Sequence, residues 1–445
     1  MKRRTELKQK LTGASVFDTK KRAFVKRDVY VSDGIICDKL AEYNTVDCEG
    51  KFIVPGYIDV HTHGCGGIDI MEADEKTLER LSLIYALHGT TTVFPTVMTA
   101  ALPKINSAIS NIKSAASDSA RFAGVHIEGP YISAKKPGCH DVSLIRKPDE
   151  SEMTALAEEI YPLKTHFTLA PEEAPEGLVS ELSKLATIGI GHISAKKPGC
   201  HDALSEGAVS FTHTFNAMTA LTHRGTGAAG AAMASSAYTE LICDGLHVSP
   251  EAVRALYKAK KYDGDKLVLI TDSIPQATLP FGNYEMNGIP FTLSEKGARK
   301  SDGTIVGSTL TLHDAIKNLM RFCDISFEEA LICATKTPAE MVGIYDSCGS
   351  IEVGKRADML ILDNEKNIFS VMEEVWASDD ERIDLVIFLN GLAIMSFELK
   401  CNAAGQSYQD AIYQFRVDRD PKTRLFWFKA GCLVNFAMDL EQVYM

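Results

Sequence analysis

The sequence predicts an α/β protein whose main part is a parallel (β/α)8 barrel, with a small β-sandwich domain built from both flanks. Three observations favour this architecture. Short apolar runs alternate with longer helical patterns, β-prone runs occur on both sides of that stretch, and the composition changes after about residue 375. A chain of 445 residues has room for one large barrel and smaller parts.

The small β domain is predicted from two separate pieces of the chain. Residues 13–58 contain short β-prone runs separated by Asp-Gly and Glu-Gly turn signals. A β character returns over residues 349–363. We therefore expect one domain made of residues 1–54 and 346–375, with the barrel between them in sequence.

The barrel is predicted over residues 55–345. Apolar runs that suit buried parallel strands are followed by helical patterns, as a series of strand–helix units requires. The clearest strand candidates are residues 91–95, 124–127, 188–191, 209–212 and 267–270, and the clearest helical stretches are 74–88, 149–160, 175–186 and 249–260.

Composition and charge exclude several classes of function. The net charge of −12, from 47 basic and 59 acidic residues, argues against nonspecific nucleic-acid binding. No apolar run approaches the ~18–20 residues that a membrane helix needs. The basic start is not followed by an apolar stretch, so we expect no signal peptide. Eleven cysteines then indicate reduced thiols and a cytoplasmic protein.

Two histidines follow the first predicted barrel strand. His61 and His63 come directly after the apolar residues 57–60. Residues i and i+2 of a strand point the same way, so both imidazoles can reach one ion at the carboxyl end of the strand. A His-x-His pair alone is a weak signal, because it also occurs by chance or as a hydrogen-bonded surface pair.

Four more polar groups end predicted barrel strands. They are Glu128, His192, His213 and Asp272. A lone acid or histidine after a strand is usually a cap or a hydrogen-bonded core group. Six such groups, counting the two earlier histidines, all at strand ends, favour a functional site instead.

The residue types indicate the chemistry of that site. Imidazole and carboxylate ligands without cysteine suit Zn²⁺ or another divalent first-row metal. Such a centre lowers the pKa of bound water toward ~7. Asp272 can accept a proton from that water and pass it to a leaving amine. The residues therefore predict metal-assisted hydrolysis of an amide.

Several motifs resemble the amidohydrolase superfamily and, within it, the N-acetylglucosamine-6-phosphate deacetylases. They are residues 55–64 (PGYIDVHTHG), 126–131 (HIEGPY), 212–218 (THTFNAM) and 244–248 (DGLHV). Glu128 separates the chain from dihydroorotases and ureases, which place a carboxylated lysine near there, and from the deaminases, which have no ligand on that strand. The similarity covers about residues 14–372. It implies cleavage of the 2-acetamido group of N-acetylglucosamine 6-phosphate to glucosamine 6-phosphate and acetate.

This resemblance implies roles for the strand-end residues. The expected metal ligands are Glu128, His192 and His213 for the principal ion, with His61 and His63 allowing a second. The ion is expected to be Zn, with Fe, Co or Mn as alternatives, and one or two ions are expected. Asp272 is implied as the acid/base, and His140, twelve residues past Glu128, as the group that polarises the acetyl carbonyl.

Contacts to a sugar phosphate follow from the same resemblance. The expected substrate-binding residues are Cys139, Asn216, Ala217, Arg224, His247, Val306, Gly307 and Ser308. Arg224 suits the phosphate because its planar fork donates several hydrogen bonds. In this family a phosphate contact can come from the neighbouring subunit, so a homodimer is implied. Two residues have simpler alternatives: His247 could cap a helix that starts near Ser249, and Asn216 could hold a turn.

One decapeptide, ISAKKPGCHD, occurs at residues 132–141 and again at 193–202. Solenoid repeats diverge and recur several times, so a recent copying event or a sequence artefact explains this pair better. The second copy follows His192 without changing its spacing to the next ligand, so we expect metal binding to survive. Pro198 should delay the helix expected there, since proline is tolerated only in the first turn.

Three other histidines have no expected role in the site. His201 is the copy of His140 in the second decapeptide, and we interpret it as accidental. His88 and His166 fit no motif and are expected to be structural.

The last part of the chain, residues 376–445, is expected to be a separate α+β fragment. Asp384, then Glu398 and Lys400, resemble a PD-(D/E)xK nuclease, and the segment is similar to the N-terminal nuclease region of a type I restriction enzyme R subunit. The two acids could hold Mg²⁺ while the lysine positions water. Glu-x-Lys alternation is common in strands, however, and a basic footprint is lacking, so a gene fusion, a frame-joined assembly or a decayed tail is expected.

Three alternative functions remain open from the sequence. The first is an N-acetylgalactosamine-6-phosphate deacetylase or another amidohydrolase. The second is a DNA-binding or nuclease component, which depends on residues 382–445 alone. The third is a catalytically inactive fusion.

Overall fold

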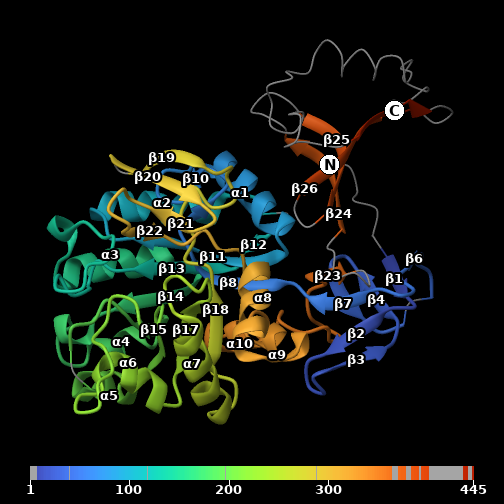
Figure 1. Ribbon diagram of the computed structural model, residues 1–445. Helices are drawn as coiled ribbons and strands as arrows, with labels where there is room; N and C mark the ends of the chain where they lie inside the picture. The colour runs from blue at the N-terminus through green and yellow to red at the C-terminus, as the bar shows by residue number, and fades with distance from the viewer. Residues whose placement is uncertain are drawn as a thin grey trace.

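The computed structural model describes residues 8–362 apart from Leu40, Asp118, Lys196 and Asn287, and five strands between residues 369 and 444. Alternating strands and helices form a barrel, and a smaller β region built from early and late parts of the chain lies beside it (Figure 1). The predicted (β/α)8 barrel with an additional β domain is confirmed.

The barrel wall in the described part of the chain consists of eight parallel strands. In order around the wall they are β8 (Tyr57–Thr62), β11 (Thr90–Met98), β13 (Gly124–Glu128), β14 (Lys164–Leu169), β15 (Thr187–Ile190), β16 (Ala208–Phe211), β17 (Tyr238–Ile242) and β18 (Leu267–Ile270). A short strand, β12 (Arg121–Phe122), adds to β11. The backbone N–H of Asp272 donates to the carbonyl of His61 at 2.8 Å, so the last strand lies against the first.

Helices connect these strands and cover the wall. They are α1 (Glu75–Leu87), α2 (Leu102–Ser114), α3 (Glu150–Ile160), α4 (Leu178–Leu182), α5 (Lys197–Ser205), α6 (Gly227–Ala234), α7 (Pro250–Tyr262), α8 (Leu312–Cys323), α9 (Phe327–Ile332) and α10 (Lys336–Met341), with 3-10 turns at Val142–Leu144 and Pro171–Glu173. Asp74, Asp149 and Ser249 cap α1, α3 and α7 by accepting from backbone N–H groups of the first turn. Within the described residues, no helix is both long and apolar enough to cross a bilayer.

The strands of the wall are buried on both faces, as parallel strands under helices usually are. All four residues of β18 (LVLI) are buried, and its apolar side chains pack in one cluster with helices α7 and α8. The inner face is different, because it carries the buried polar groups His61, His126, His166 and Glu240. The barrel core therefore contains a polar network directly beneath the strand ends.

The small β region consists of two four-stranded sheets. One sheet has the order β5 (Ile35–Cys37), β4 (Val29–Ser32), β1 (Lys8–Thr12), β6 (Asn44–Asp47), and the other β23 (Met359–Leu362), β7 (Phe52–Pro55), β2 (Ser15–Asp18), β3 (Ala23–Lys26). Val16, Val31, Ile53 and Ile351 share one buried cluster. Strand β23 pairs antiparallel with β7, so both flanks of the barrel contribute to one sheet. The exact domain boundaries remain predictions.

A third sheet, which the sequence did not indicate, is inserted between β18 and α8. It consists of β19 (Gly282–Met286), β20 (Ile289–Ser294), β21 (Gly297–Arg299) and β22 (Ile305–Gly307), and a two-stranded ribbon, β9 (Gly64–Cys65) with β10 (Ile68–Asp69), follows β8. Phe291, Leu293 and Val306 give the inserted sheet its own buried cluster together with Ile274. The insertion brings residues 304–307 to the mouth of the barrel.

The strands beyond the small domain form a sheet of their own. They are β24 (Phe369–Trp376), β25 (Arg382–Leu389), β26 (Leu392–Leu399), β27 (Val434–Met438) and β28 (Val443–Tyr444). Asp384 and Glu398 belong to the neighbouring strands β25 and β26. Lys400 lies outside the described residues, so the nuclease-like trio and the α+β class of this fragment stay predictions.

The two identical decapeptides adopt different structures. Residues 132–141 form turns, whereas the second copy enters helix α5, which begins at Lys197 with Pro198 in its first turn. His140 is buried and its twin His201 is exposed. Tertiary surroundings, not the local sequence, therefore decide the conformation of this segment.

Candidate metal centre and active site

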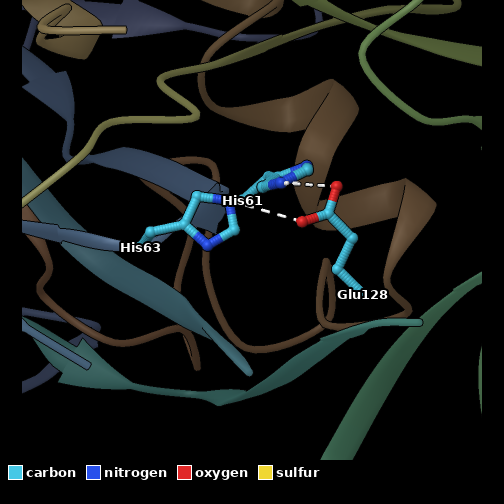
Figure 2. A group of neighbouring side chains, drawn as sticks. All are labelled: His61, His63 and Glu128. Carbon is cyan, nitrogen blue, oxygen red and sulfur yellow. Dashed lines mark ion pairs between the residues drawn. The ribbon is translucent and has the colours of Figure 1, made fainter. Parts of the chain in front are cut away.

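The strand-end residues converge at the carboxyl end of the barrel. His61 lies in β8 and Glu128 ends β13, while His192, His213 and Asp272 each follow the last residue of their strand by two positions. Figure 2 shows the rings of His61 and His63 on one side of the Glu128 carboxylate. The expected set of metal ligands thus forms one cluster.

Glu128 is the centre of the first group. Its Oε1 lies 3.1 Å from His192 Nε2 and 3.1 Å from His213 Nε2, and the two ring nitrogens are 3.0 Å apart. Around a tetrahedral zinc with bonds of ~2.05 Å, ligand atoms are about 3.3 Å apart. These three donor atoms therefore fit a single ion with little movement.

His61 and His63 form a second group around the same carboxylate. His61 Nε2 lies 3.5 Å from Glu128 Oε1, and His63 Nε2 lies 3.4 Å from Oε2 (Figure 2). Asp272 Oδ1 is 3.0 Å from His63 Nε2 and 3.4 Å from His61 Nε2. Among the described residues, the buried His61 Nε2 has no hydrogen-bond partner. A buried nitrogen of this kind is costly unless it binds an ion, so the residues present fit a metal.

Three of the site residues have a left-handed backbone. The φ angles of His192, His213 and Asp272 are +48°, +30° and +47°, which is uncommon for residues other than glycine. Such strain persists only where the surrounding structure imposes it, and it concentrates at functional sites. The sharp turns direct these side chains from the strand ends toward the barrel axis.

Hydrogen bonds fix which ring nitrogens face the cluster. His192 Nδ1 lies 2.8 Å from the carbonyl oxygen of Lys136, and His140 Nδ1 lies 2.8 Å from the Thr99 hydroxyl. The Nε2 atoms then point inward, and His140 Nε2 lies 3.4 Å from Glu128 Oε2. Outer partners of this type orient metal ligands and set their tautomers.

Both carboxylates of the site are held in the ionised form. Burial alone would raise the pKa of Glu128, but the charges of His61 and His140 outweigh burial and hold it well below its ordinary value. Burial is likewise outweighed at Asp272, where the charge of His61 and the hydrogen bond from His63 lower the pKa. The site is therefore ready to receive a cation.

A cavity of about 470 Å³ opens from this cluster. Six of the expected substrate-binding residues line it: Cys139, Asn216, Ala217, His247, Val306 and Gly307. Arg224 is exposed and Ser308 is buried, and neither belongs to the lining of this cavity. The Ser308 hydroxyl instead accepts a hydrogen bond from the backbone of Leu310.

The two simpler alternatives have different outcomes. Ser249, not His247, caps helix α7, so the capping role suggested for His247 is wrong. His247 Nδ1 instead lies 2.6 Å from Asp244 Oδ2, and the ring faces the cavity. Asn216 does hold a turn, because its side-chain amide donates to the His213 carbonyl at 3.2 Å, and it also lines the cavity.

Sequence reasoning missed the residues that support the cluster from below. Glu240 accepts from His166 Nε2 at 2.9 Å and lies 3.4 Å from His61 Nδ1, and all three side chains are fully buried. A single acid inside the otherwise uncharged strand β17 (YTELI) was the available signal. His166, expected to be structural, belongs to the network beneath the site.

The repeated decapeptide supplies a matched pair of glycine variants. A Cβ at Gly138, where φ is +57°, would lie 2.9 Å from His192 Cε1, so Gly138→Ala should displace this ligand. We expect at least a 10-fold loss of metal affinity. The equivalent Gly199→Ala in helix α5 meets only Ala195 Cβ at 3.3 Å and should change the stability by less than about 1 kcal/mol. Metal titration and thermal unfolding of both variants test this, and equal behaviour would contradict it.

Comparisons with known proteins agree with this geometry. The model of the amidohydrolase family matches residues 52–391, and that of the type I restriction enzyme R protein N terminus matches residues 354–445. The N-acetylglucosamine-6-phosphate deacetylase of Bacillus subtilis (strain 168) is 35% identical over 322 residues, which cover 70% of this chain and 81% of that protein. The N-acetylgalactosamine-6-phosphate deacetylase of Escherichia coli O157:H7 is 30% identical, with coverages of 78% and 92%.

A solved structure supports the same relationship. The crystal structure of N-acetylglucosamine-6-phosphate deacetylase from Pasteurella multocida superposes with a TM-score of 0.75 at 28% identity. The match covers 81% of this chain and 97% of that one. The extent of these matches and the shared barrel show that the chain belongs to the amidohydrolase family.

Proposed function

We propose that the protein hydrolyses the 2-acetamido group of N-acetylglucosamine 6-phosphate to glucosamine 6-phosphate and acetate. The observation that carries the proposal is the cluster of Glu128, His192 and His213 with Asp272 beside it, at the floor of a cavity of about 470 Å³. The named activity of a relative at 35% identity supports this choice among amide substrates.

The cofactor is proposed to be zinc, as one or two ions. Glu128, His192 and His213 would hold the first ion, and His61 and His63 would hold a second. The donor set of imidazoles and one carboxylate, without thiolate, is typical of catalytic zinc and also suits Fe, Co or Mn. When bound, the ion supplies a Lewis acid that lowers the pKa of water and polarises a carbonyl.

In this proposal Asp272 transfers the proton and His140 stabilises the developing negative charge. Asp272, ionised and at the cavity wall, accepts a proton from the attacking water and transfers it to the amine nitrogen as the C–N bond breaks. His140 Nε2 faces the cavity and stabilises the negative charge that develops on the acetyl oxygen. The products are the free amine and acetate.

The sugar phosphate is proposed to bind along the cavity wall. Asn216, Ala217, His247, Cys139 and residues 306–307 all line it. Arg224 is exposed and does not belong to this lining, and we infer that it meets a phosphate at the edge of the site, where a second subunit of a homodimer would complete the contacts. Ser308 would act through the backbone, because its N–H and carbonyl belong to the loop beside Ile274.

A cytoplasmic location fits this proposal. None of the nine cysteines in the described part of the chain is in a disulfide, which is typical of proteins in a reducing compartment. N-acetylgalactosamine 6-phosphate is the second candidate substrate, because a relative with that name covers a similar share of the chain. Acetate release from the two epimers by the zinc-loaded protein tests both candidates. Release from neither epimer by soluble, metal-loaded protein would overturn the proposal.

Thr99 should hold the ring of His140 in place. Its hydroxyl lies 2.8 Å from His140 Nδ1 and donates to the Glu128 carbonyl at 3.4 Å, so it fixes the ring with Nε2 facing the cavity. We expect Thr99→Val to lower kcat about 10-fold or more with little change in KM. Thr99→Ser keeps the hydroxyl and should restore most of kcat. Equal kcat values for the wild type and the valine variant would contradict this role.

For the C-terminal fragment, we infer a restriction-subunit-like segment joined to the deacetylase, from about residue 376 onward. The match at residues 354–445 and the separate sheet β24–β28 support this inference. Plasmid cleavage with Mg²⁺ tests whether the segment has nuclease activity, and we expect none.

A further inference from the structure

We propose that Glu240 is a positioning residue that makes His61 a metal ligand and thereby creates the second metal position. The inference rests on the metal site in the proposed function and goes beyond it by assigning a residue that touches neither the ion nor the substrate. Glu240 lies in the middle of β17 (Tyr238–Ile242), and its side chain is completely buried inside the barrel.

The surroundings of Glu240 are unusual for a buried acid. In the described part of the chain, both of its ion-pair partners are histidines: His166 Nε2 at 2.9 Å from Oε1 and His61 Nδ1 at 3.4 Å from Oε2. The Ser210 hydroxyl approaches Oε1 at 3.5 Å. A buried carboxylate costs several kcal/mol unless it is paired and hydrogen-bonded. The role of Glu240 therefore follows from its contacts with His166 and His61.

One partner anchors the carboxylate and the other is aligned by it. His166 Nδ1 lies 3.0 Å from the hydroxyl of Thr187 on the neighbouring strand, so His166 is fixed at both ring nitrogens. Glu240 bridges from this fixed ring to His61. The ring of His61 is thus held from beneath the site, at a depth where solvent cannot replace the contact.

The consequence for His61 follows from the chemistry of imidazole. An imidazole that binds an ion has one N–H and one lone pair, and a hydrogen bond from Nδ1–H to a carboxylate leaves that lone pair on Nε2. His61 Nε2 points to the metal cluster, 3.5 Å from Glu128 Oε1 and 3.4 Å from Asp272 Oδ1. Glu240 therefore directs Nε2 of His61, the nitrogen that would carry the lone pair of a bound ligand, toward the cluster.

The other core histidines provide an internal comparison. His126 packs against His61 with ring centroids 4.3 Å apart, yet its two nitrogens meet the hydroxyls of Thr96 and Thr168 at 3.1 and 2.8 Å. His166 is also hydrogen-bonded at both nitrogens. Of these three rings in the described core, His61 alone has an inward nitrogen without a hydrogen-bond partner. Only His61 is thus left free to bind an ion.

Zinc titration of the metal-free full-length protein, followed by competition with a chelator, tests the proposal without any substrate. We expect the wild type to bind two ions. Glu240→Met removes the carboxylate at similar volume and should weaken the second ion about 100-fold, while the first is retained. Glu240→Gln keeps an acceptor for Nδ1–H and should weaken the second ion only about 10-fold. Ser210→Ala is the matched control, since it alters the same buried network without touching His61, and it should bind two ions normally.

Each outcome of this experiment decides the matter. Normal binding of the second ion in both Glu240 variants would overturn the proposal, as would a wild type that binds a single ion. If Glu240→Met does not fold, the glutamine variant carries the test alone, with its unfolding temperature as the check of integrity. Acetate release is measured separately, so a wild type that binds two ions but releases no acetate would refute the proposed function and leave the role of Glu240 intact.

Discussion

Glu128→Gln is expected to abolish both metal binding at the principal position and acetate release. The carboxylate lies within 3.5 Å of ring nitrogens of five histidines, so no other residue in the described site contacts as many of the proposed ligands. Glutamine has nearly the same shape but no charge. Its amide NH₂ group would occupy the position of a carboxylate oxygen, beside the ring nitrogens that are proposed to bind the cation. We expect the zinc affinity to fall by more than about 100-fold.

Stability and metal content separate this effect from misfolding. Without the carboxylate, the imidazoles around it lose the anion that offsets their burial, so the metal-free variant should unfold at a lower temperature than the metal-free wild type. Glu172→Gln is a suitable control, because Glu172 accepts from the backbone of Ser194 and Ala195 beside His192 without reaching the cluster. It should keep its zinc and its activity. Full zinc content in Glu128→Gln would show that the ion binds elsewhere.

The strand-end ligands could be predicted because a parallel barrel imposes a simple rule. Every strand delivers its carboxyl end to the same face, so the chain position of Glu128, His192, His213 or Asp272 after an apolar run already implies their proximity. The His-x-His pair after β8 follows the same rule with the period of a strand. For these residues the local sequence carries all the information that is needed.

The residues beneath the metal cluster could not be predicted from such a local rule. Glu240, His166 and His61 belong to strands that are distant in sequence, and their contact depends on the stagger of strands around the closed barrel. The repeated decapeptide is a clearer case, since one amino-acid sequence is a loop at His140 and a helix at His201. The inserted sheet β19–β22 was missed because its short strands contain no long apolar run.

Asp272→Asn is expected to remove catalysis while leaving the metal in place. Asparagine keeps an oxygen near His63 Nε2, which lies 3.0 Å from Oδ1 in the wild type, but it cannot accept a proton from water at neutral pH. Loss of a general acid/base costs typically 10²–10⁴-fold in rate, so kcat should fall by about that factor. KM should change little, because the sugar phosphate is proposed to bind along other parts of the cavity wall.

Asp69→Asn is the matched control for this experiment. Asp69 also lines the cavity, but its carboxylate accepts from the backbone N–H of Met71 at 2.8 Å and is not within ion-pair distance of the cluster. It should lower kcat by no more than a few-fold, and both variants should retain zinc. If Asp272→Asn loses its zinc along with its activity, Asp272 acts mainly as a metal ligand. The proton transfer to the amine must then be assigned to another group. If it keeps both zinc and acetate release, the proton does not pass through Asp272 at all.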